Sequence, residues 1–338
     1  MVFCLKKIIG IILIASLLAL TVVGCSGDSG TAGSKEVNFA DAGWDSNKLH
    51  NAIAGLIAEE LWDYKTIETP GSTTVLHEGL LKGEVDVHME VWTDNLATYN
   101  DDLAEGKLKE LSTNFDDNYQ GVYVPRYVIE GDAERGIEAS APDLKTIQQL
   151  KDYPEVFKDE ENPEMGRMYG AIPGWEVDEI LYKKFMHLGM DETFIYFRPG
   201  SDPALSAAIT SAYEKGEPIA AYYWEPTWLL GLYDMVLLED EPFDSETYIE
   251  GKTELPAVKV TVGVSNEFAD NEENKEFIDF LSNYETSSAL TSEGLGYMQE
   301  TGADYKETAK WFINEHPELL DVWLTPGDAE TIKTVLNE

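Results

Sequence analysis

Hydrophobic and polar residues follow two periods along this chain, and their order predicts strands that alternate with helices. Residues 36–40 have the pattern of a short strand, and apolar residues then recur at helical spacing from Leu49 to Leu61, with Ser46 as the predicted N-cap. Runs of strand and helix in this order predict an α/β fold with mostly parallel sheets. Further helices are expected at 73–81, 147–150, 177–188, 203–215, 273–283 and 306–314, and further strands near 67 and at 85–91, 168–172, 194–197, 219–224 and 258–264.

Three tryptophans stand where a strand-like apolar run gives way to a turn. They are Trp92 in MEVWTDN, Trp175 in AIPGWEVDE and Trp224 in AAYYWEPTW. A single tryptophan more often packs in a core. Ligand sites in α/β folds, however, gather at the carboxyl ends of strands. Three large π faces at such positions therefore favour a binding site for a cation.

The first residues predict a secretory leader that ends at a lipid-modified cysteine. Two lysines precede an apolar run over 8–23, which is shorter than the roughly 20 residues that a membrane span needs. Small residues lead up to Cys25, as in the cleavage sites of bacterial lipoproteins. We therefore expect a signal peptide at 1–24, a diacylglycerol on Cys25 and a flexible tether at 25–35.

The amino-acid composition disfavours or excludes several classes of binding partner and of active site. The formal net charge is -40, which disfavours nucleic acid and anionic membrane surfaces, and the 43% hydrophobic content favours a packed core over disorder. The two cysteines, Cys4 and Cys25, lie in the leader or at its edge, which excludes a thiolate zinc site and a catalytic cysteine in the folded part. The five histidines lack metal-ligand spacing, so we expect neither a metal nor another cofactor.

Several strings, in a fixed order, resemble one protein family. The family is that of the substrate-binding lipoproteins of glycine betaine and proline betaine ABC transporters, the OpuAC and ProX-like proteins. The strings are GWDSNKLHNAIAGLIAEE, EVDVHMEVWTDN, IPGWEVDE, YYWEPTWL and KWFINEHPELLDVWL, and they span nearly all of the chain after the leader.

The resemblance implies a two-lobed, clamshell-like binding protein of the type II periplasmic class, with two crossover segments between the lobes. Lobe I is then expected at 36–120 and 237–338, and lobe II at 121–236. The implied partners are a small betaine ligand, an ABC transporter permease with its ATPase, and the membrane through the lipid on Cys25. The protein is expected to act outside the cytoplasm, anchored to the cell membrane, and not as an enzyme.

In this family the ligand lies between the lobes, and tryptophans surround its methylated ammonium. The matching positions here are Trp92, Trp175 and Trp224, and Trp44 in GWDS is a further candidate because it opens a helix beside the expected cleft. A quaternary ammonium has no N–H, so hydrogen bonds cannot recognise it directionally, whereas ring faces can. The resemblance thus gives the strand-end tryptophans a common role.

The carboxylate of a betaine needs a second set of partners. None of the three tryptophan strings contains an arginine, so we expect the backbone N–H groups of Glu176 and Val177, at the start of a predicted helix, to meet it. Some relatives carry a histidine soon after the first tryptophan, where this chain has Asp94, Asn95 and Leu96. Asn95 is therefore the expected side-chain partner.

Two alternatives stay open at this point. The sequence does not choose between a betaine and the alternative ligands choline, carnitine or another methylated amine, since all carry the same cation and differ at the other end. The competing class of protein is a secreted glycoside hydrolase, because such enzymes also line clefts with tryptophan and carboxylates. Glu90, Asp94 and Glu225 would then supply the acid and base pair.

Overall fold

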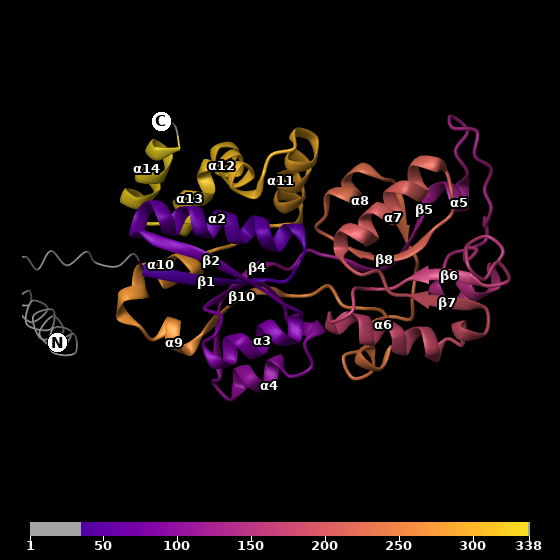
Figure 1. Cartoon of the computed structure of the whole chain (residues 1–338), viewed down its shortest axis with the longest axis horizontal. Coiled ribbons are helices and arrows are strands. Elements are labelled where there is room, and N and C mark those ends of the chain that lie inside the picture. Colours follow the sequence, from indigo (N-terminus) through magenta and orange to yellow (C-terminus); the bar gives the residue numbers. More distant parts are fainter. Residues whose placement is uncertain (1–34, 337–338) are drawn as a thin grey trace, which may run out of the picture. The chain divides into compact units, whose positions relative to one another are not determined.

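Two five-stranded sheets organise residues 35–336, the part of the chain that the computed structural model describes (Figure 1). The predicted signal peptide at 1–24, the lipid site Cys25 and the predicted tether as far as residue 34 lie outside these residues. The first sheet has the order β2 (Tyr64–Pro70), β1 (Lys35–Asp41), β3 (Val87–Trp92), β10 (Val260–Ser265), β4 (Leu108–Phe115). The second has the order β7 (Phe194–Phe197), β6 (Gly166–Tyr169), β8 (Ala220–Trp224), β5 (Gln120–Pro125), β9 (Met235–Leu237).

The prediction of mostly parallel sheets is wrong, since both sheets are mixed. In the first sheet β1 pairs with β3 in parallel, whereas β10 is antiparallel to both β3 and β4. In the second sheet β6 is parallel to β7 and β8, whereas β5 is antiparallel to β8 and β9. A crossover helix forces two strands to run in parallel. Because β10 returns from the other sheet, no such helix sets its direction.

Helices cover both faces of the first sheet, and we call this sheet with its helices the first lobe. In Figure 1, α3 and α4 lie on one side of it, and α2 with the C-terminal helices α11 to α14 lies on the other. Its helices are α2 (Asp45–Trp62), α3 (Thr73–Lys82), α4 (Tyr99–Ala104), α9 (Asn266–Ala269), α10 (Lys275–Ser282), α11 (Ser288–Thr301), α12 (Tyr305–Glu315), α13 (Pro317–Trp323) and α14 (Pro326–Val335), with short 3-10 turns η1 (Thr93–Asn95) and η5 (Glu272–Asn274).

The second sheet and its helices form the second lobe. The helices are α5 (Arg126–Glu130), α6 (Glu176–His187), α7 (Asp202–Lys215) and α8 (Trp228–Leu232), with 3-10 turns η2 (Ile147–Asp152), η3 (Met190–Glu192) and η4 (Tyr248–Glu250). The chain passes between the two sheets twice, once after β4 and once before β10. One cluster of buried apolar side chains runs from the first lobe into the second, so the core is continuous between the sheets.

Local chemistry explains where the main helices begin and end. The Ser72 hydroxyl accepts from the backbone N–H of Val75 and starts α3, which ends at Gly83 with φ 71°. The predicted cap of α2 is wrong, because that helix begins at Asp45, with Trp44 at the N-cap and no side-chain cap bond. Ser46 lies in the first turn instead, and its hydroxyl donates to Oε2 of Glu90 at 3.1 Å. Ser46 thus joins α2 to β3 within the first lobe.

The strand ends place two tryptophans at one edge of the sheets. Trp92 is the last residue of β3, and Trp224 is the last residue of β8. Trp175 directly precedes α6, and Trp44 directly precedes α2. All four are therefore held by the boundary of a regular element, where the backbone is fixed and the side chain is free to face the other lobe.

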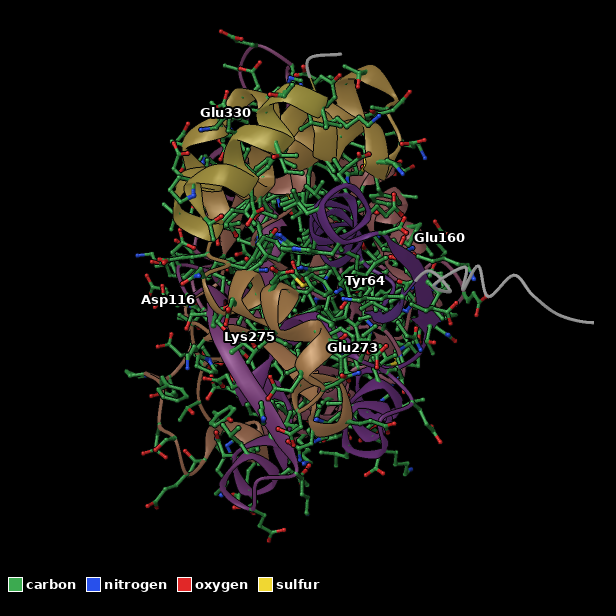
Figure 2. The ribbon with its side chains drawn as sticks, turned by 90° about the vertical axis from the view of Figure 1, so that its left-hand side faces the viewer. Tyr64, Asp116, Glu160, Glu273, Lys275 and Glu330 are labelled. Atoms are coloured by element: carbon green, nitrogen blue, oxygen red, sulfur yellow. The ribbon has the colours of Figure 1, made fainter. Side chains whose placement is uncertain are left out.

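The excess of acidic residues lies largely on the surface. Asp116, Glu160, Glu273 and Glu330, all exposed, have their side chains at the outside of the molecule (Figure 2). Solvent screens charges at such positions, so they act mainly on solubility. Within residues 35–336, none of the helices is both long and apolar enough to cross a bilayer.

Candidate functional site

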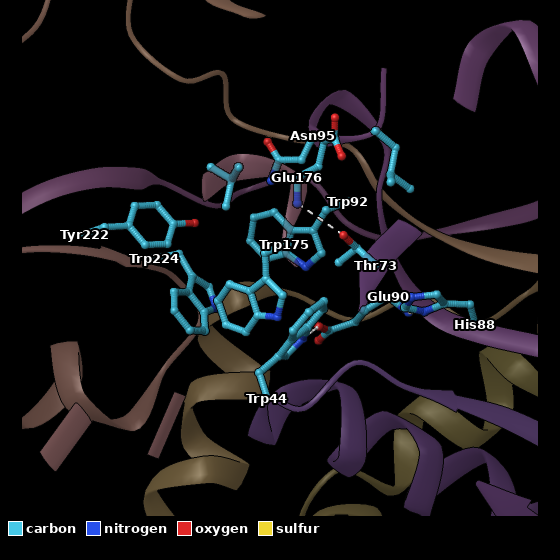
Figure 3. A pocket seen from close by; sticks show the side chains of 12 residues that line it. Trp44, Thr73, His88, Glu90, Trp92, Asn95, Trp175, Glu176, Tyr222 and Trp224 are labelled. Carbon is cyan, nitrogen blue, oxygen red and sulfur yellow. Dashed lines mark hydrogen bonds between the residues drawn. The ribbon is translucent and has the colours of Figure 1, made fainter. Parts of the chain in front are cut away.

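A pocket between the two lobes gathers the predicted tryptophans. From the first lobe come Trp44 and Trp92, and from the second come Trp175 and Trp224, each between 3% and 8% exposed (Figure 3). The pocket is lined by Trp44, Thr73, His88, Glu90, Trp92, Asn95, Leu96, Trp175, Glu176, Val177, Tyr222 and Trp224. Every residue that the sequence predicted for the ligand site is therefore among the lining residues, and the structure brings all seven together.

The rings meet at right angles rather than in stacks. The centroid of Trp175 lies 5.1 Å from that of Trp44, with 84° between the planes, and 5.1 Å from that of Trp224, with 81° between the planes. Trp224 in turn is stacked with Tyr222, whose centroid is 5.8 Å away. Edge-to-face rings at this separation are in van der Waals contact. The cavity between them is about 30 Å³, so the rings have to separate before a methylated ammonium can lie against their faces.

The polar residues predicted for the ligand carboxylate have partners within the protein. The Asn95 amide exchanges two hydrogen bonds of 3.3 Å with the Gln120 amide, which also accepts from the Tyr222 hydroxyl. The backbone N–H of Glu176 donates to Oγ1 of Thr73 at 3.2 Å. Val177 is buried on the pocket lining. A ligand carboxylate has to share or replace these bonds in order to use the same groups.

The Thr73 hydroxyl connects the lobes beside the pocket. It accepts from Glu176, and it donates to the backbone carbonyl of Gly174 at 3.2 Å. Gly174 has φ 94°, and a Cβ at this position would lie 2.9 Å from Cβ of Ser72. Glycine is needed here because both the left-handed backbone and the close approach exclude a side chain. The two lobes are thus in contact at the rim of the pocket.

A buried carboxylate, that of Glu90, lies on the same lining (Figure 3). Its Oε2 accepts from Nε1 of Trp44 and from the Ser46 hydroxyl. Its Oε1 accepts no hydrogen bond of ordinary geometry from any residue within 35–336. Burial raises the pKa of Glu90 to about 7, and the hydrogen bonds from Trp44 and Ser46 oppose this rise. Near neutral pH, Glu90 in the pocket is therefore present in both its protonated and its ionised form.

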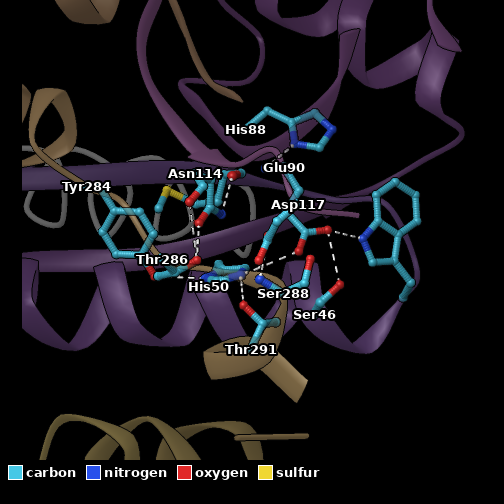
Figure 4. A network of polar contacts seen from close by, with 12 residues as sticks. Ser46, His50, His88, Glu90, Asn114, Asp117, Tyr284, Thr286, Ser288 and Thr291 are labelled. Atoms are coloured by element: carbon cyan, nitrogen blue, oxygen red, sulfur yellow. Dashed lines mark hydrogen bonds and ion pairs between the residues drawn. The ribbon is translucent and has the colours of Figure 1, made fainter. Parts of the chain in front are cut away.

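Histidines adjoin this acid without neutralising it. Nε2 of His50 lies 3.5 Å from Oε1 of Glu90, and the His50 ring also contacts the hydroxyls of Tyr284 and Thr291 (Figure 4). Burial lowers the pKa of His50, and likewise that of His88, to about 3. Both imidazoles are consequently neutral at physiological pH. They supply hydrogen-bonding atoms to the network but no positive charge.

Sequence reasoning did not assign Thr73, His88 or Tyr222 to the site, and it considered Glu90 only as part of a hydrolase pair. A usable signal was present in β3, where side chains alternate between two faces. His88, Glu90 and Trp92 have the same parity and so share the face that carries the predicted tryptophan. Thr73 offers no such signal, because only the packing of one lobe on the other brings it to Glu176.

The lining of the pocket is rich in aromatic side chains and also carries two carboxylates, one imidazole and one amide. None of the described residues that line the pocket is a lysine or an arginine. Over residues 35–336 there is also no group of three or more His, Cys, Asp or Glu side chains placed to hold a metal ion. Two mixed sheets, two chain crossings and an aromatic pocket between the lobes define the class: this is a two-lobed α/β ligand-binding protein.

Comparison with known proteins identifies the family. The family described as the substrate-binding domain of an ABC-type glycine betaine transport system (OpuAC) matches residues 35–315, and the chain belongs to it. No protein of curated function matches the sequence significantly. The family is one of transport substrate-binding domains, so the alternative of a glycoside hydrolase gains no support from it.

Solved structures of low sequence identity share the fold. The glycine betaine/L-proline-binding protein ProX from Borrelia burgdorferi has 18% identity and a TM-score of 0.69, with 88% of this chain and 100% of that chain covered. A choline-binding protein of an ABC transporter, solved with choline, has 18% identity, a TM-score of 0.68, and coverage of 90% and 99%. Lactococcal OpuAC, in its closed form with glycine betaine, has 18% identity, a TM-score of 0.64, and coverage of 86% and 100%. These likenesses confirm the predicted two-lobed fold.

Proposed function

We propose that this protein is the extracytoplasmic solute-binding component of an ABC importer, and that it captures glycine betaine or a related quaternary ammonium osmolyte between its lobes. The observation that carries the proposal is the single pocket lined by Trp44 and Trp92 from one lobe and by Trp175 and Trp224 from the other. Because both lobes supply aromatic rings, a cation bound between the two lobes contacts both of them and stabilises the closed form of the protein.

The energies are sufficient for such a ligand. A desolvated cation and π contact contributes on the order of 2 kcal/mol, so three of them give about 6 kcal/mol. Charge-assisted hydrogen bonds to the other end of the ligand add about 1.5 to 3 kcal/mol each. Micromolar affinity corresponds to roughly 8 kcal/mol, and the surplus offsets the loss of ligand freedom. The cage therefore reaches useful affinity without an arginine on the lining.

The proposed cycle consists of capture, closure and delivery. Bonds such as Thr73 to Gly174, and the contact of Trp44 with Trp175, join the lobes beside the pocket. Ligand entry therefore requires the lobes to part, and a ligand that touches both lobes shifts the population back to the closed form. The closed protein then delivers its ligand to a permease driven by an ATPase. A lipid on Cys25 keeps the binding protein at the membrane where that permease lies.

The test is isothermal titration of the domain from residue 35 onward with glycine betaine, choline, carnitine and unmethylated glycine. Saturable binding of at least one methylated ligand, with no response to glycine, is the expected result. Glycine has the same carboxylate as glycine betaine but carries N–H groups in place of methyl groups, so it isolates the role of the ring faces. If none of the methylated ligands binds, the proposed function is wrong.

A further inference from the structure

The carboxylate of Glu90, which has no positively charged partner among the described residues, affects which ligands the pocket binds. We propose that Glu90 is the specificity-determining residue of this pocket, and that its carboxylate pairs with the bound ammonium so that singly charged cations such as choline bind more tightly than zwitterionic betaines. The inference rests on the proposed function and deepens it, because it selects among the ligands that share a methylated ammonium.

Geometry places the carboxylate of Glu90 on the lining of the site. The side chain is fully buried, it extends from β3 on the same face as Trp92, and its Oε2 is held by Trp44 and Ser46. These two bonds fix the carboxylate next to one wall of the aromatic pocket and leave Oε1 without a hydrogen bond from the described part of the chain. Glu90 thus brings to the pocket lining a buried carboxylate, one oxygen of which has no hydrogen bond from the described residues.

Among residues 35–336, no lysine or arginine forms an ion pair with this carboxylate. The His50 ring lies 3.5 Å from Oε1, and that ring is neutral because burial lowers its pKa to about 3. His88, the other imidazole on the lining, is neutral for the same reason. A buried carboxylate without a counter-charge is unfavourable, and the group responds by holding its proton. A bound ammonium would provide the missing positive charge.

A carboxylate on the ligand, unlike its ammonium group, finds no group of opposite charge among the described side chains of the lining. The only charged side chains among the described lining residues are those of Glu90 and Glu176, and both are acidic. The donors predicted for a carboxylate are engaged, since the Asn95 amide pairs with Gln120 and the Glu176 N–H bonds to Thr73. A zwitterion thus brings a second negative charge into a pocket that has no basic side chain. Choline brings an uncharged hydroxyl instead.

The experiment is titration of choline and glycine betaine into the wild type, Glu90→Gln and Glu160→Gln. Glutamine keeps the shape and an acceptor for Trp44 and Ser46 but removes the charge. We expect the wild type to bind choline at least about tenfold more tightly than glycine betaine, and Glu90→Gln to lower that ratio by about tenfold or more. Glu160 is exposed, so Glu160→Gln is the matched loss of one charge and should leave the ratio unchanged.

The outcomes separate this inference from the proposed function. If the wild type prefers glycine betaine, or if Glu90→Gln weakens both ligands equally, Glu90 merely positions Trp44 and the inference is wrong while the proposed function stands. If the wild type binds no methylated ammonium, the proposed function fails and the inference falls with it. Should Glu90→Gln not fold, the wild-type ratio together with Glu90→Asp, which keeps the charge and should keep the preference for choline, decides the matter.

Discussion

Two buried carboxylates, one in each lobe, differ in whether the surrounding protein supplies a positive charge for them. Asp178 in α6 of the second lobe is 2% exposed, and its Oδ2 accepts from Nε of Arg198 at 2.7 Å while its Oδ1 accepts from the Tyr196 hydroxyl at 2.7 Å. Glu90 in the first lobe is fully buried, and one of its oxygens has no hydrogen bond from the described residues. Of these two carboxylates, only Asp178 has a positively charged side chain as its partner, because His50 beside Glu90 is neutral.

The surroundings of Asp178 are those of a structural ion pair, whereas those of Glu90 support its proposed role in the ligand site. Arg198 also lies over the rings of Tyr182 and Tyr196, at 4.6 Å and 4.9 Å from their centroids, so the Asp178 pair is part of a closed structural cluster. A buried charge is tolerated in a fold when it is paired and hydrogen-bonded. Glu90 departs from this rule next to an aromatic pocket, where a ligand can supply the absent charge.

The largest expected effect comes from breaking the structural pair. Arg198→Met should lower the free energy of unfolding by about 3 to 4 kcal/mol, because it leaves the Asp178 charge buried and unpaired, and the partial exposure of Arg198 limits the loss. Urea denaturation measures the change. Arg126→Met is the matched control: Arg126 forms its ion pairs with Asp234 and Glu130 on the surface, so less than about 1 kcal/mol should be lost.

A double variant tests the reason for this effect. Asp178→Asn combined with Arg198→Met removes both charges, so most of the stability lost in Arg198→Met should return. If the double variant is as unstable as the single one, packing of Arg198 on the tyrosines dominates, and the contrast between the two carboxylates is not one of charge.

The second prediction concerns Glu90 and the pH dependence of stability in the absence of ligand. The pKa of Glu90 is raised from 4.5 to about 7 by burial, so the folded protein holds this proton more tightly than the unfolded chain does. The resulting stability is complete below pH 4.5 and is lost as the pH rises through about 7. Glu90→Gln should remove a decline of roughly 3 kcal/mol over this window.

Thermal and urea unfolding between pH 4 and pH 8 measure this decline. Asp202 carries a similar shift, since burial and the nearby charge of Asp45 raise its pKa to about 7, but its contribution is common to the wild type and to Glu90→Gln and cancels in the difference. Glu160→Gln should show the wild-type slope. Parallel pH curves for the wild type and Glu90→Gln would mean that Glu90 has an ordinary pKa and that the pocket does have a counter-charge for it.

The third prediction tests the aromatic walls. Trp175→Ala should weaken binding of the methylated ligand by about 1 to 3 kcal/mol, because it removes a ring that meets both Trp44 and Trp224. Isothermal titration measures the affinity, and circular dichroism checks the fold. Trp311 stacks on Tyr297 away from the pocket, so Trp311→Ala should change stability without changing affinity. Wild-type affinity in a folded Trp175→Ala variant would remove Trp175 from the site.

The smallest expected effect concerns the hydroxyl that links the first lobe to the start of α6. Thr73→Val keeps the shape but removes the bonds to Gly174 and Glu176, and should weaken ligand binding by about 1 kcal/mol because the closed form loses a contact. Thr74 is the exposed neighbour of Thr73, so Thr74→Val is its control. Equal affinities in both variants would mean that these bonds do not favour closure.

The sequence by itself determined part of the elements and most of the lining of the pocket, whereas β4, β9, α4, α8, α11, α13 and α14 were not predicted. Period and turn residues identify α3, α6 and α7 closely, and the position of Trp92 and Trp224 at strand ends identifies the pocket. These features are local: they depend on residues a few positions apart, whose chemistry can be read directly from the chain. The family resemblance followed from the same local strings, and the match over residues 35–315 confirmed it.

Only the tertiary structure decided the direction of β10, the contact of Thr73 with α6, and the isolation of Glu90. Each depends on residues far apart in sequence: β10 reaches β3 after a passage through the second lobe, and His50 and Trp44 reach Glu90 from α2 and its N-terminal boundary. Alternation in β3 places Glu90 beside Trp92. Which side chains surround the Glu90 carboxylate depends on the neighbouring elements. Here those elements contribute neutral histidines and indole rings.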